Sequence, residues 1–163
     1  MMKKDVFFKT RQILNENNFI IDKFDDNRPW GGFFVIDENQ DQKFADKYFN
    51  GVNVSELKIT GKLSPKILII EPNKRLSWQY HNRRAEIWKV VKGQIGIIRS
   101  NDNTEGEIIN VEEGTIIKLN QGERHRIIGS DDWAVVAEIW QHTDAMSPSN
   151  EEDIVRVQDD FGR

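Results

Sequence analysis

A small set of histidine, carboxylate and amide side chains in this sequence has the types and spacing to bind a metal ion. His81 follows Gln79 by two residues, Glu86 comes five residues later, and His125 lies further along the chain. Side chains alternate between the faces of a β-strand, so Gln79 and His81 would point to the same side. Two imidazoles, a carboxylate and an amide oxygen are ligands of intermediate softness. Together, Gln79, His81, Glu86 and His125 predict one divalent ion, with Zn²⁺ as first choice and Mn²⁺, Fe²⁺ or Ni²⁺ as alternatives.

Each of these residues also has a simpler interpretation. An isolated histidine is more often a hydrogen-bonded structural residue than a ligand, and a glutamine on a strand usually faces solvent. The four residues between His81 and Glu86 are enough for a turn that would return the carboxylate to the same interior. A metal site therefore requires that this turn and two strands bring the side chains together.

The composition favours one folded domain and excludes several classes of function. The chain has 163 residues, of which 37% are hydrophobic, so it can bury a single core. The formal charge of −4 gives no overall attraction to nucleic acid or to anionic membrane surfaces. No cysteine is present, which excludes disulfides, thiolate metal sites and a cysteine nucleophile. No apolar run matches a signal peptide or a membrane span, so we expect a cytoplasmic protein.

Short apolar runs of strand length, separated by turn residues, dominate the sequence from residue 28 onward. The predicted strands are residues 32–37, 65–71, 76–81, 85–91, 94–99, 108–111, 115–119, 125–128 and 133–140. Many short strands with regular turns predict a closed antiparallel barrel or a sandwich. Residues 4–17 predict a short leading helix, and residues 39–64 predict a long loop or lid with a helical turn. A second polar segment covers residues 142–150.

Two separated motifs resemble those of the cupin superfamily. They are Gln79-x-His81-x4-Glu86-x6-Gly93 and Gly114-x7-Gly122-x2-His125. The resemblance implies a mainly β fold, a cupin-type antiparallel β-barrel (double-stranded β-helix or jelly roll) with a short N-terminal helix and a metal in the barrel mouth. It implies an N-terminal helix and lead-in over residues 1–27 and a single cupin domain over residues 28–163.

Further segments are similar to the type II mannose-6-phosphate isomerase domain. They are Arg28-Pro29-Trp30-Gly31, residues 76–81, residues 84–88, and Glu152-Asp153-Ile154-Val155-Arg156 followed by Phe161-Gly162-Arg163. In many relatives a guanylyltransferase domain precedes this one, and residues 1–27 are too few to hold it. Three positions depart from the cupin pattern: Asn73 replaces a glycine, Asn120 replaces a proline and Gly129 replaces an asparagine.

The resemblance implies that the chain interconverts mannose 6-phosphate and fructose 6-phosphate through an enediolate. Proton removal beside the carbonyl needs a base, for which Glu138 is the first candidate and Lys66 the competing one. Lys66, Arg84 and Arg156 lie at positions that suit phosphate binding, Arg84 being counted with the catalytic residues as well. Trp30 could stack on a sugar face. The implied partner is a small phosphorylated sugar.

Other interpretations of these residues and of the whole chain stay open. Arg84 could pair with a surface carboxylate, Arg156 could hold the C-terminal segment, and Trp30 could be core packing. The main alternative function is a non-catalytic cupin that binds a phosphosugar or a nucleotide sugar. A metal-dependent oxygenase and a metal-free sugar-nucleotide epimerase are further alternatives. If the chain forms a homodimer, the leading helix and residues 19–21 would be the contact.

Overall fold

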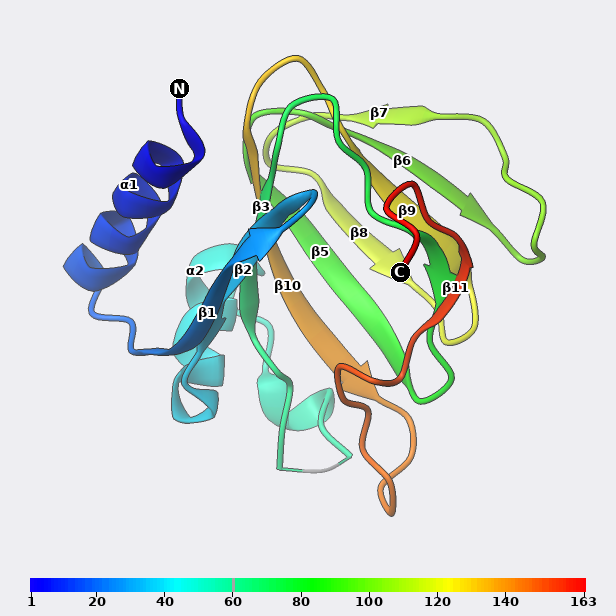
Figure 1. The fold of residues 1–163 in the computed structure, drawn as a ribbon. Helices are drawn as coiled ribbons and strands as arrows, with labels where there is room; N and C mark the ends of the chain where they lie inside the picture. Colours follow the sequence, from blue (N-terminus) through cyan, green and yellow to red (C-terminus); the bar gives the residue numbers. More distant parts are fainter. Residues whose placement is uncertain (60) are drawn as a thin grey trace.

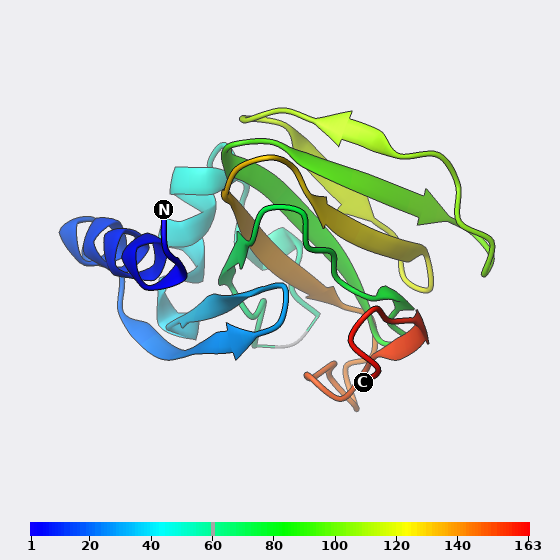
Figure 2. The ribbon, with the colours of Figure 1, turned by 45° about the horizontal axis from the view of Figure 1, so that its top comes forward.

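Two antiparallel β-sheets form the body of the protein in the computed structural model, which describes residues 1–59 and 61–163 (Figure 1). The six-stranded sheet has the order β1 (Ile21–Arg28), β2 (Gly31–Ile36), β3 (Lys66–Ile70), β10 (Ala134–His142), β5 (Arg84–Lys92) and β8 (Ile116–Leu119). The five-stranded sheet has the order β11 (Val155–Gln158), β4 (Trp78–Tyr80), β9 (Arg124–Gly129), β6 (Ile95–Ser100) and β7 (Ile109–Val111). Figure 2 shows the two sheets facing each other.

The predicted barrel is confirmed: each run predicted as a strand overlaps a strand of one of the two sheets. The structure adds two edge strands that the sequence pattern did not indicate. β1 begins at Ile21, ahead of the boundary expected at residue 28, and pairs with β2. β11 pairs with β4, so that Arg156 lies opposite Gln79.

Alternation along the strands divides the apolar side chains into two clusters. On β10, Ala134 and Val136 join the cluster between the sheets, whereas Ala137 and Ile139 join a cluster on the outer face of the six-stranded sheet. The residues facing the interior at the far end of the same strand are Glu138 and Trp140. The period of two thus turns polar side chains toward the interior at one end of the barrel.

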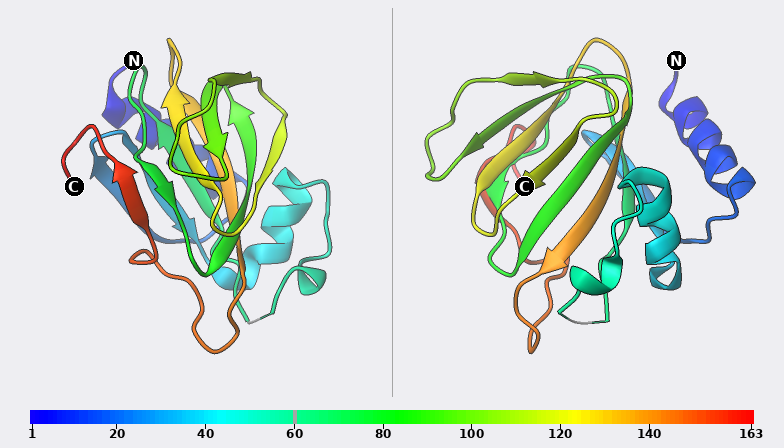
Figure 3. Two further views of the ribbon diagram at one scale, coloured as in Figure 1. Left: turned by 90° about the vertical axis from the view of Figure 1, so that its right-hand side faces the viewer. Right: turned by 180° about the vertical axis from the view of Figure 1, so that it is seen from behind.

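Helices cover the outer face of the six-stranded sheet, on the side away from β6 and β7 (Figure 3). α1 (Lys3–Glu16) contributes Val6, Phe7 and Leu14 to the outer cluster. Phe19, expected as part of a dimer contact, packs in the same cluster, whereas Ile20 is exposed. No helix among the described residues is long and apolar enough to cross a membrane.

The segment from residue 39 to residue 64 differs from the expected loop or lid. It contains α2 (Asp41–Tyr48), flanked by the short 3-10 helices η1 (Glu38–Gln40) and η2 (Val54–Glu56); residue 60 lies outside the described residues. Phe44, Tyr48 and Leu63 are buried in the outer cluster, because aromatic and aliphatic side chains recur on one face of the segment. The described part of the segment therefore supports the outside of the sheet and does not line the pocket described below.

Two glycines allow close contacts between strands and turns near the pocket. Gly31 has a φ of 138°, and a Cβ there would lie 1.8 Å from the backbone oxygen of Ile69. A Cβ at position 129 would lie 2.2 Å from the backbone oxygen of Glu71. Glycine at position 129 therefore suits the close approach of this loop, and Asn73 adopts the left-handed φ of 59° that asparagine tolerates.

Candidate metal centre and pocket

Three strands bring the predicted ligands to one end of the barrel. Gln79 lies on β4, and His81 is the first residue after that strand. Glu86 lies on β5, and His125 lies on β9. Gln79 and His125 are register partners, so β4 and β9 place their ends side by side. The chain reverses at Asn82 and Arg83 and returns as β5, which turns Glu86 back toward the histidines.

His81, Glu86 and His125 form a buried group that can hold a metal ion. Their ligand atoms all lie within 4.8 Å of one another. Glu86 Oε1 is 2.8 Å from His81 Nε2 and 3.2 Å from His125 Nε2. The three side chains are at most 3% exposed, so this group is shielded from solvent.

The hydrogen bonds of the imidazoles leave their Nε2 atoms facing Glu86. His81 Nδ1 donates to the backbone oxygen of Asp153 at 2.7 Å, and His125 Nδ1 donates to that of Glu123 at 2.9 Å. Glu86 Oε1 and His125 Nε2 are buried and have no hydrogen-bond partner among the residues that the structure describes. Lone pairs that converge on one point without a proton between them repel, and a cation would remove this cost. The donor set therefore fits a divalent ion.

The charges around the ligands favour the protonation states that metal binding needs. Burial lowers the pKa of His81, although Glu86 opposes this shift. For Glu86, burial alone would raise the pKa, but the adjacent imidazoles and the Arg84 guanidinium outweigh it and hold the pKa well below its ordinary value. A neutral imidazole and an ionised carboxylate are the forms that coordinate a metal.

Gln79 lies beside the group through its amide. Its Nε2 is 3.3 Å from His81 Nε2, and its Oε1 accepts a hydrogen bond from the Ser77 hydroxyl at 2.6 Å. A half-turn of the amide would direct Oε1 toward His81, and the Ser77 hydroxyl could then accept in place of donating. Gln79 is thus placed to become a fourth ligand by a single side-chain rotation.

Glu138 lies in the same pocket, held by two indoles. Trp88 Nε1 donates to its Oε2 at 2.9 Å, and Trp140 Nε1 donates to its Oε1 at 2.8 Å. Burial, and then the neighbouring Glu86 carboxylate, raise the pKa of Glu138 well above its ordinary value. A buried carboxyl whose pKa is raised toward neutral pH is suited to accept and return protons.

Lys66 and Arg84 line the pocket but are engaged with other protein groups. Lys66 forms an ion pair with Glu151, and its ammonium lies 4.5 Å from the centroid of the Trp140 ring. Arg84 lies 3.6 Å from the same centroid and donates to the Ser149 hydroxyl at 2.9 Å. Both cations therefore connect the barrel to residues 149–151.

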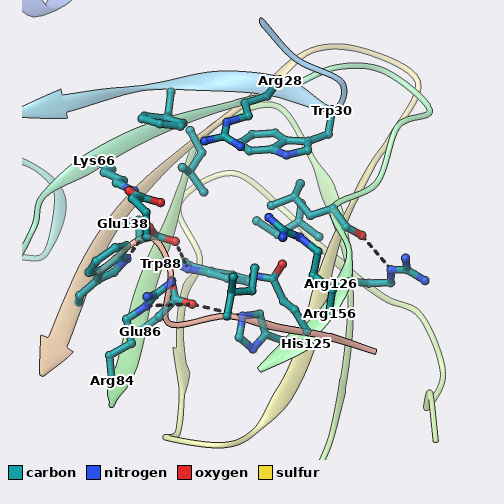
Figure 4. A pocket seen from close by; sticks show the side chains of 18 of the residues that line it. Arg28, Trp30, Lys66, Arg84, Glu86, Trp88, His125, Arg126, Glu138 and Arg156 are labelled. Carbon is teal, nitrogen blue, oxygen red and sulfur yellow. Dashed lines mark hydrogen bonds and ion pairs between the residues drawn. The ribbon is translucent and has the colours of Figure 1, made fainter. Parts of the chain in front are cut away.

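Trp30 and Arg156 lie at the other side of the pocket. Trp30 is 7% exposed and packs in the cluster between the sheets, yet it also lines the pocket wall. Arg156 reaches the pocket from β11. Figure 4 shows Arg28 and Arg84 at opposite ends of the view, with Glu138 and Glu86 between them.

Several further residues lie at the site that were not predicted from the sequence. Asp153 and Ser149 hold His81 and Arg84, Glu151 pairs with Lys66, and Arg28 and Arg163 line the pocket. Arg28, Asp153 and Arg163 lie in the segments that carry the family resemblance, and this resemblance could have identified them as site residues. Ser149 and Glu151 lie in or beside a polar stretch with no motif.

A closed antiparallel β-barrel with a His–Glu–His group at its open end defines a cupin. The chain belongs to the family described as mannose-6-phosphate isomerase C-terminal, which matches residues 42–159. This confirms the resemblance that the sequence motifs indicated. A comparison with curated protein sequences finds no match.

Solved structures share the fold at low sequence identity. The capsular polysaccharide assembling protein CapF from Staphylococcus aureus matches with a TM-score of 0.54 and 16% identity, over 86% of this chain and 34% of that one. Vicilin from Corylus avellana (hazelnut) matches with a TM-score of 0.55 and 18% identity, over 85% of this chain and 36% of that one. This chain thus spans about a third of the length of these proteins. At such identity the likeness shows the fold alone.

Proposed function

We propose that this protein is a metal-dependent sugar-phosphate isomerase that interconverts mannose 6-phosphate and fructose 6-phosphate. The observation that carries the proposal is the placement of Glu138, a buried carboxyl with a raised pKa, in the same pocket as the His81, Glu86 and His125 group. Membership of the family named for this isomerase supports the choice of reaction.

The reaction needs a base, stabilisation of negative charge and exclusion of water. Glu138 would take the proton from C2 of the aldose and, as the carboxylic acid, return it to C1, while the hydroxyl proton on O2 passes to O1 to give the ketose. Trp88 and Trp140 would hold this carboxyl in place through their indole N–H groups. His81, Glu86 and His125, with Gln79 as a fourth ligand, would hold the metal, Zn²⁺ being the first choice. Such an ion polarises oxygens on C1 and C2 and favours the negative charge that develops there.

The charge of the pocket supports an anionic substrate. Six cationic side chains line it, against three carboxyl groups. The cations are Arg28, Lys66, Arg84, Arg126, Arg156 and Arg163, and the acids are Glu86, Glu138 and Glu151. Because the chain as a whole carries a formal charge of −4, this positive excess is a local feature of the pocket.

One contact favours the alternative of a phosphosugar- or nucleotide-sugar-binding cupin without turnover. The ion pair between Lys66 and Glu151 neutralises a cation that a catalytic cycle could use. In that case the pocket would bind the sugar without exchanging its protons.

The test is proton exchange followed by NMR. The purified protein, loaded with Zn²⁺, is incubated with mannose 6-phosphate in D₂O, with a chelated sample in parallel. Formation of fructose 6-phosphate and deuteration at C2 of mannose 6-phosphate, both lost on chelation, are the expected results. Binding of mannose 6-phosphate with neither product nor deuteration, in samples loaded with each of the four metals, would favour the binding protein.

A further inference from the structure

Three arginines, one at the end of β1 and two in the C-terminal segment, line the pocket on the side away from Arg84. Arg28 ends β1, Arg156 lies on β11, and Arg163 follows β11 after a turn. All three line the pocket that contains Glu86 and His125, and Figure 4 shows Arg28 and Arg156 among the lining side chains, apart from Arg84. The fold therefore collects cations that are far apart in the sequence.

The three guanidinium groups are close enough to influence one another. Burial lowers the pKa of Arg156, and the positive charges of Arg163 and Arg28 lower it further, with Asp159 acting in the opposite direction. Arg156 and Arg163 are exposed and Arg28 is half-buried. Like charges held close together repel, so their arrangement is stabilised when an anion binds between them.

The aspartates near these arginines do not neutralise the group. Arg28 Nε lies 3.0 Å from Asp25, and Arg163 donates to both carboxylate oxygens of Asp159, from Nε at 2.9 Å and from Nη2 at 3.1 Å. Arg156 has no carboxylate within ion-pair distance among the residues that the structure describes. Three cations thus share two fixed carboxylates, which leaves a local positive excess.

The other cations of the pocket are committed to the protein itself. Lys66 pairs with Glu151, and Arg84 donates to Ser149. Arg126 is fully buried and is engaged by the side chains of Glu105 and Gln158 and by a backbone oxygen. The guanidinium best able to accept an external anion is therefore Arg156, with Arg28 and Arg163 beside it.

We propose that Arg28, Arg156 and Arg163 form an anion subsite that binds the phosphate group of a phosphorylated sugar. Arginine suits this task because its planar guanidinium can donate two parallel hydrogen bonds to phosphate oxygens. Trp30, two residues after Arg28 in the turn between β1 and β2, supplies a flat wall for the body of the ligand. The choice of a sugar phosphate rests on the proposed function, whereas the phosphate subsite rests on the arginines alone.

Binding titrations with mannose 6-phosphate, mannose and inorganic phosphate test the subsite. The Zn²⁺-loaded wild type is expected to bind mannose 6-phosphate at least about tenfold more tightly than mannose, with phosphate competing. Arg156→Gln and Arg163→Gln are each expected to weaken mannose 6-phosphate binding about tenfold or more. Arg156→Lys, which keeps the charge but not the planar fork, should lose less. Arg11→Gln, which removes a positive charge on α1 away from the pocket, is the matched control.

The variants also separate this subsite from the isomerase proposal. Circular dichroism and thermal melting confirm that each variant folds, and Arg163→Gln changes a residue outside the strands. Wild-type affinity for mannose 6-phosphate in both folded Gln variants, or a wild type that binds mannose and mannose 6-phosphate equally, would overturn the subsite. Arginine-dependent binding without C2 deuteration would retain the subsite and overturn the isomerase. Deuteration with an unchanged KM for mannose 6-phosphate in both variants would retain the isomerase and overturn the subsite.

Discussion

His81 donates its Nδ1–H to the backbone oxygen of Asp153 at 2.7 Å, across 72 residues of sequence. The Asp153 carboxylate in turn accepts from the backbone amides of Asn82 and Arg83, both at 3.0 Å, and from the Ser149 hydroxyl at 2.6 Å. The segment after β10 therefore fixes both the ring of His81 and the turn that leads to Glu86. An outer contact of this kind sets the tautomer and direction of a metal ligand.

Replacing Asp153 should weaken both the fold and the metal site. Asp153→Ala leaves two backbone amides and the Ser149 hydroxyl without their acceptor, so we expect a loss of roughly 1–3 kcal/mol in the free energy of unfolding. Because His81 is then less well oriented, metal affinity should fall roughly 10–100-fold. Urea unfolding and competitive metal titration measure the two effects.

Asp144, which lies in the same segment after β10, provides the control for Asp153. Asp144 accepts only from amides of its own exposed loop, those of Met146 and Ser147. Asp144→Ala should therefore leave metal affinity unchanged. Wild-type metal affinity in Asp153→Ala would show that this segment does not orient His81.

Metal binding should raise the thermal stability of the protein. A ligand of the folded state at about 100 times its Kd adds about 2.7 kcal/mol, which corresponds to a rise in Tm of roughly 5–10 °C for a chain of this size. Comparing Zn²⁺, Mn²⁺, Fe²⁺ and Ni²⁺ by calorimetry would also rank the metals. The rise should disappear in His125→Ala and persist in Glu107→Gln, whose side chain is exposed. An equal rise in His125→Ala would place the metal elsewhere.

The positions of most strands and three of the four predicted ligands follow from local sequence patterns. Alternation along the run that became β10 and the turn residues between runs predicted the strands, since both signals depend on neighbouring residues alone. Gln79, His81 and Glu86 lie within eight residues, so strand geometry and one turn are enough to bring them near one another. β1 and β11 were missed because edge strands with mostly polar, exposed faces lack that alternation.

The surroundings of this group depend on contacts between distant segments, which spacing cannot predict. Lys66 and Arg84 are residue types that commonly bind phosphate. In the structure they contact Glu151 and Ser149 instead, which come from a segment without a recognisable pattern. The packing of α2 on the outer sheet face depends on Phe44 and Tyr48 finding Phe19, again across many residues. Only the folded chain shows which cations remain available to a ligand.

Glu138→Gln should remove turnover while leaving the metal bound. Loss of a positioned base lowers kcat by roughly 10²–10⁴-fold. The Gln side chain also presents an NH₂ group to one of the two indole donors, so a moderate loss of stability is expected. Metal content and kcat are measured together, with Glu112→Gln on the exposed surface as control. Turnover close to the wild-type rate would exclude Glu138 as the base.

The raised pKa of Glu138 also predicts the acidic limb of the rate profile. The base must be ionised, so kcat/KM should fall as the pH drops through the pKa of Glu138, which lies well above the ordinary value of 4.5. The midpoint of that limb is measured from initial rates in buffers of constant ionic strength. A rate that stays constant down to pH 4.5 would mean that another group accepts the proton.

His142 should make the stability of the protein depend on pH between about 4 and 6.5. Ser149 donates its backbone N–H to His142 Nδ1 at 2.9 Å, and burial lowers the pKa of His142 to about 4. Above about pH 6.5 the ring is neutral in both the folded and the unfolded chain, so it does not change the free energy of unfolding with pH. As the pH falls below this, the unfolded chain binds a proton that the folded chain does not, so the free energy of unfolding decreases until about pH 4.

His142→Asn isolates this contribution, because its Oδ1 can accept the Ser149 N–H but does not titrate. The variant should show a smaller loss of stability than the wild type when urea unfolding is compared at pH 7 and pH 5. The NMR shift of the His142 ring proton should titrate with a midpoint near 4 in the wild type. A midpoint near 6.5, or an equal loss of stability in the variant, would mean that His142 does not cause the acid dependence of stability. The segment that orients His81 would then be insensitive to acid through this contact.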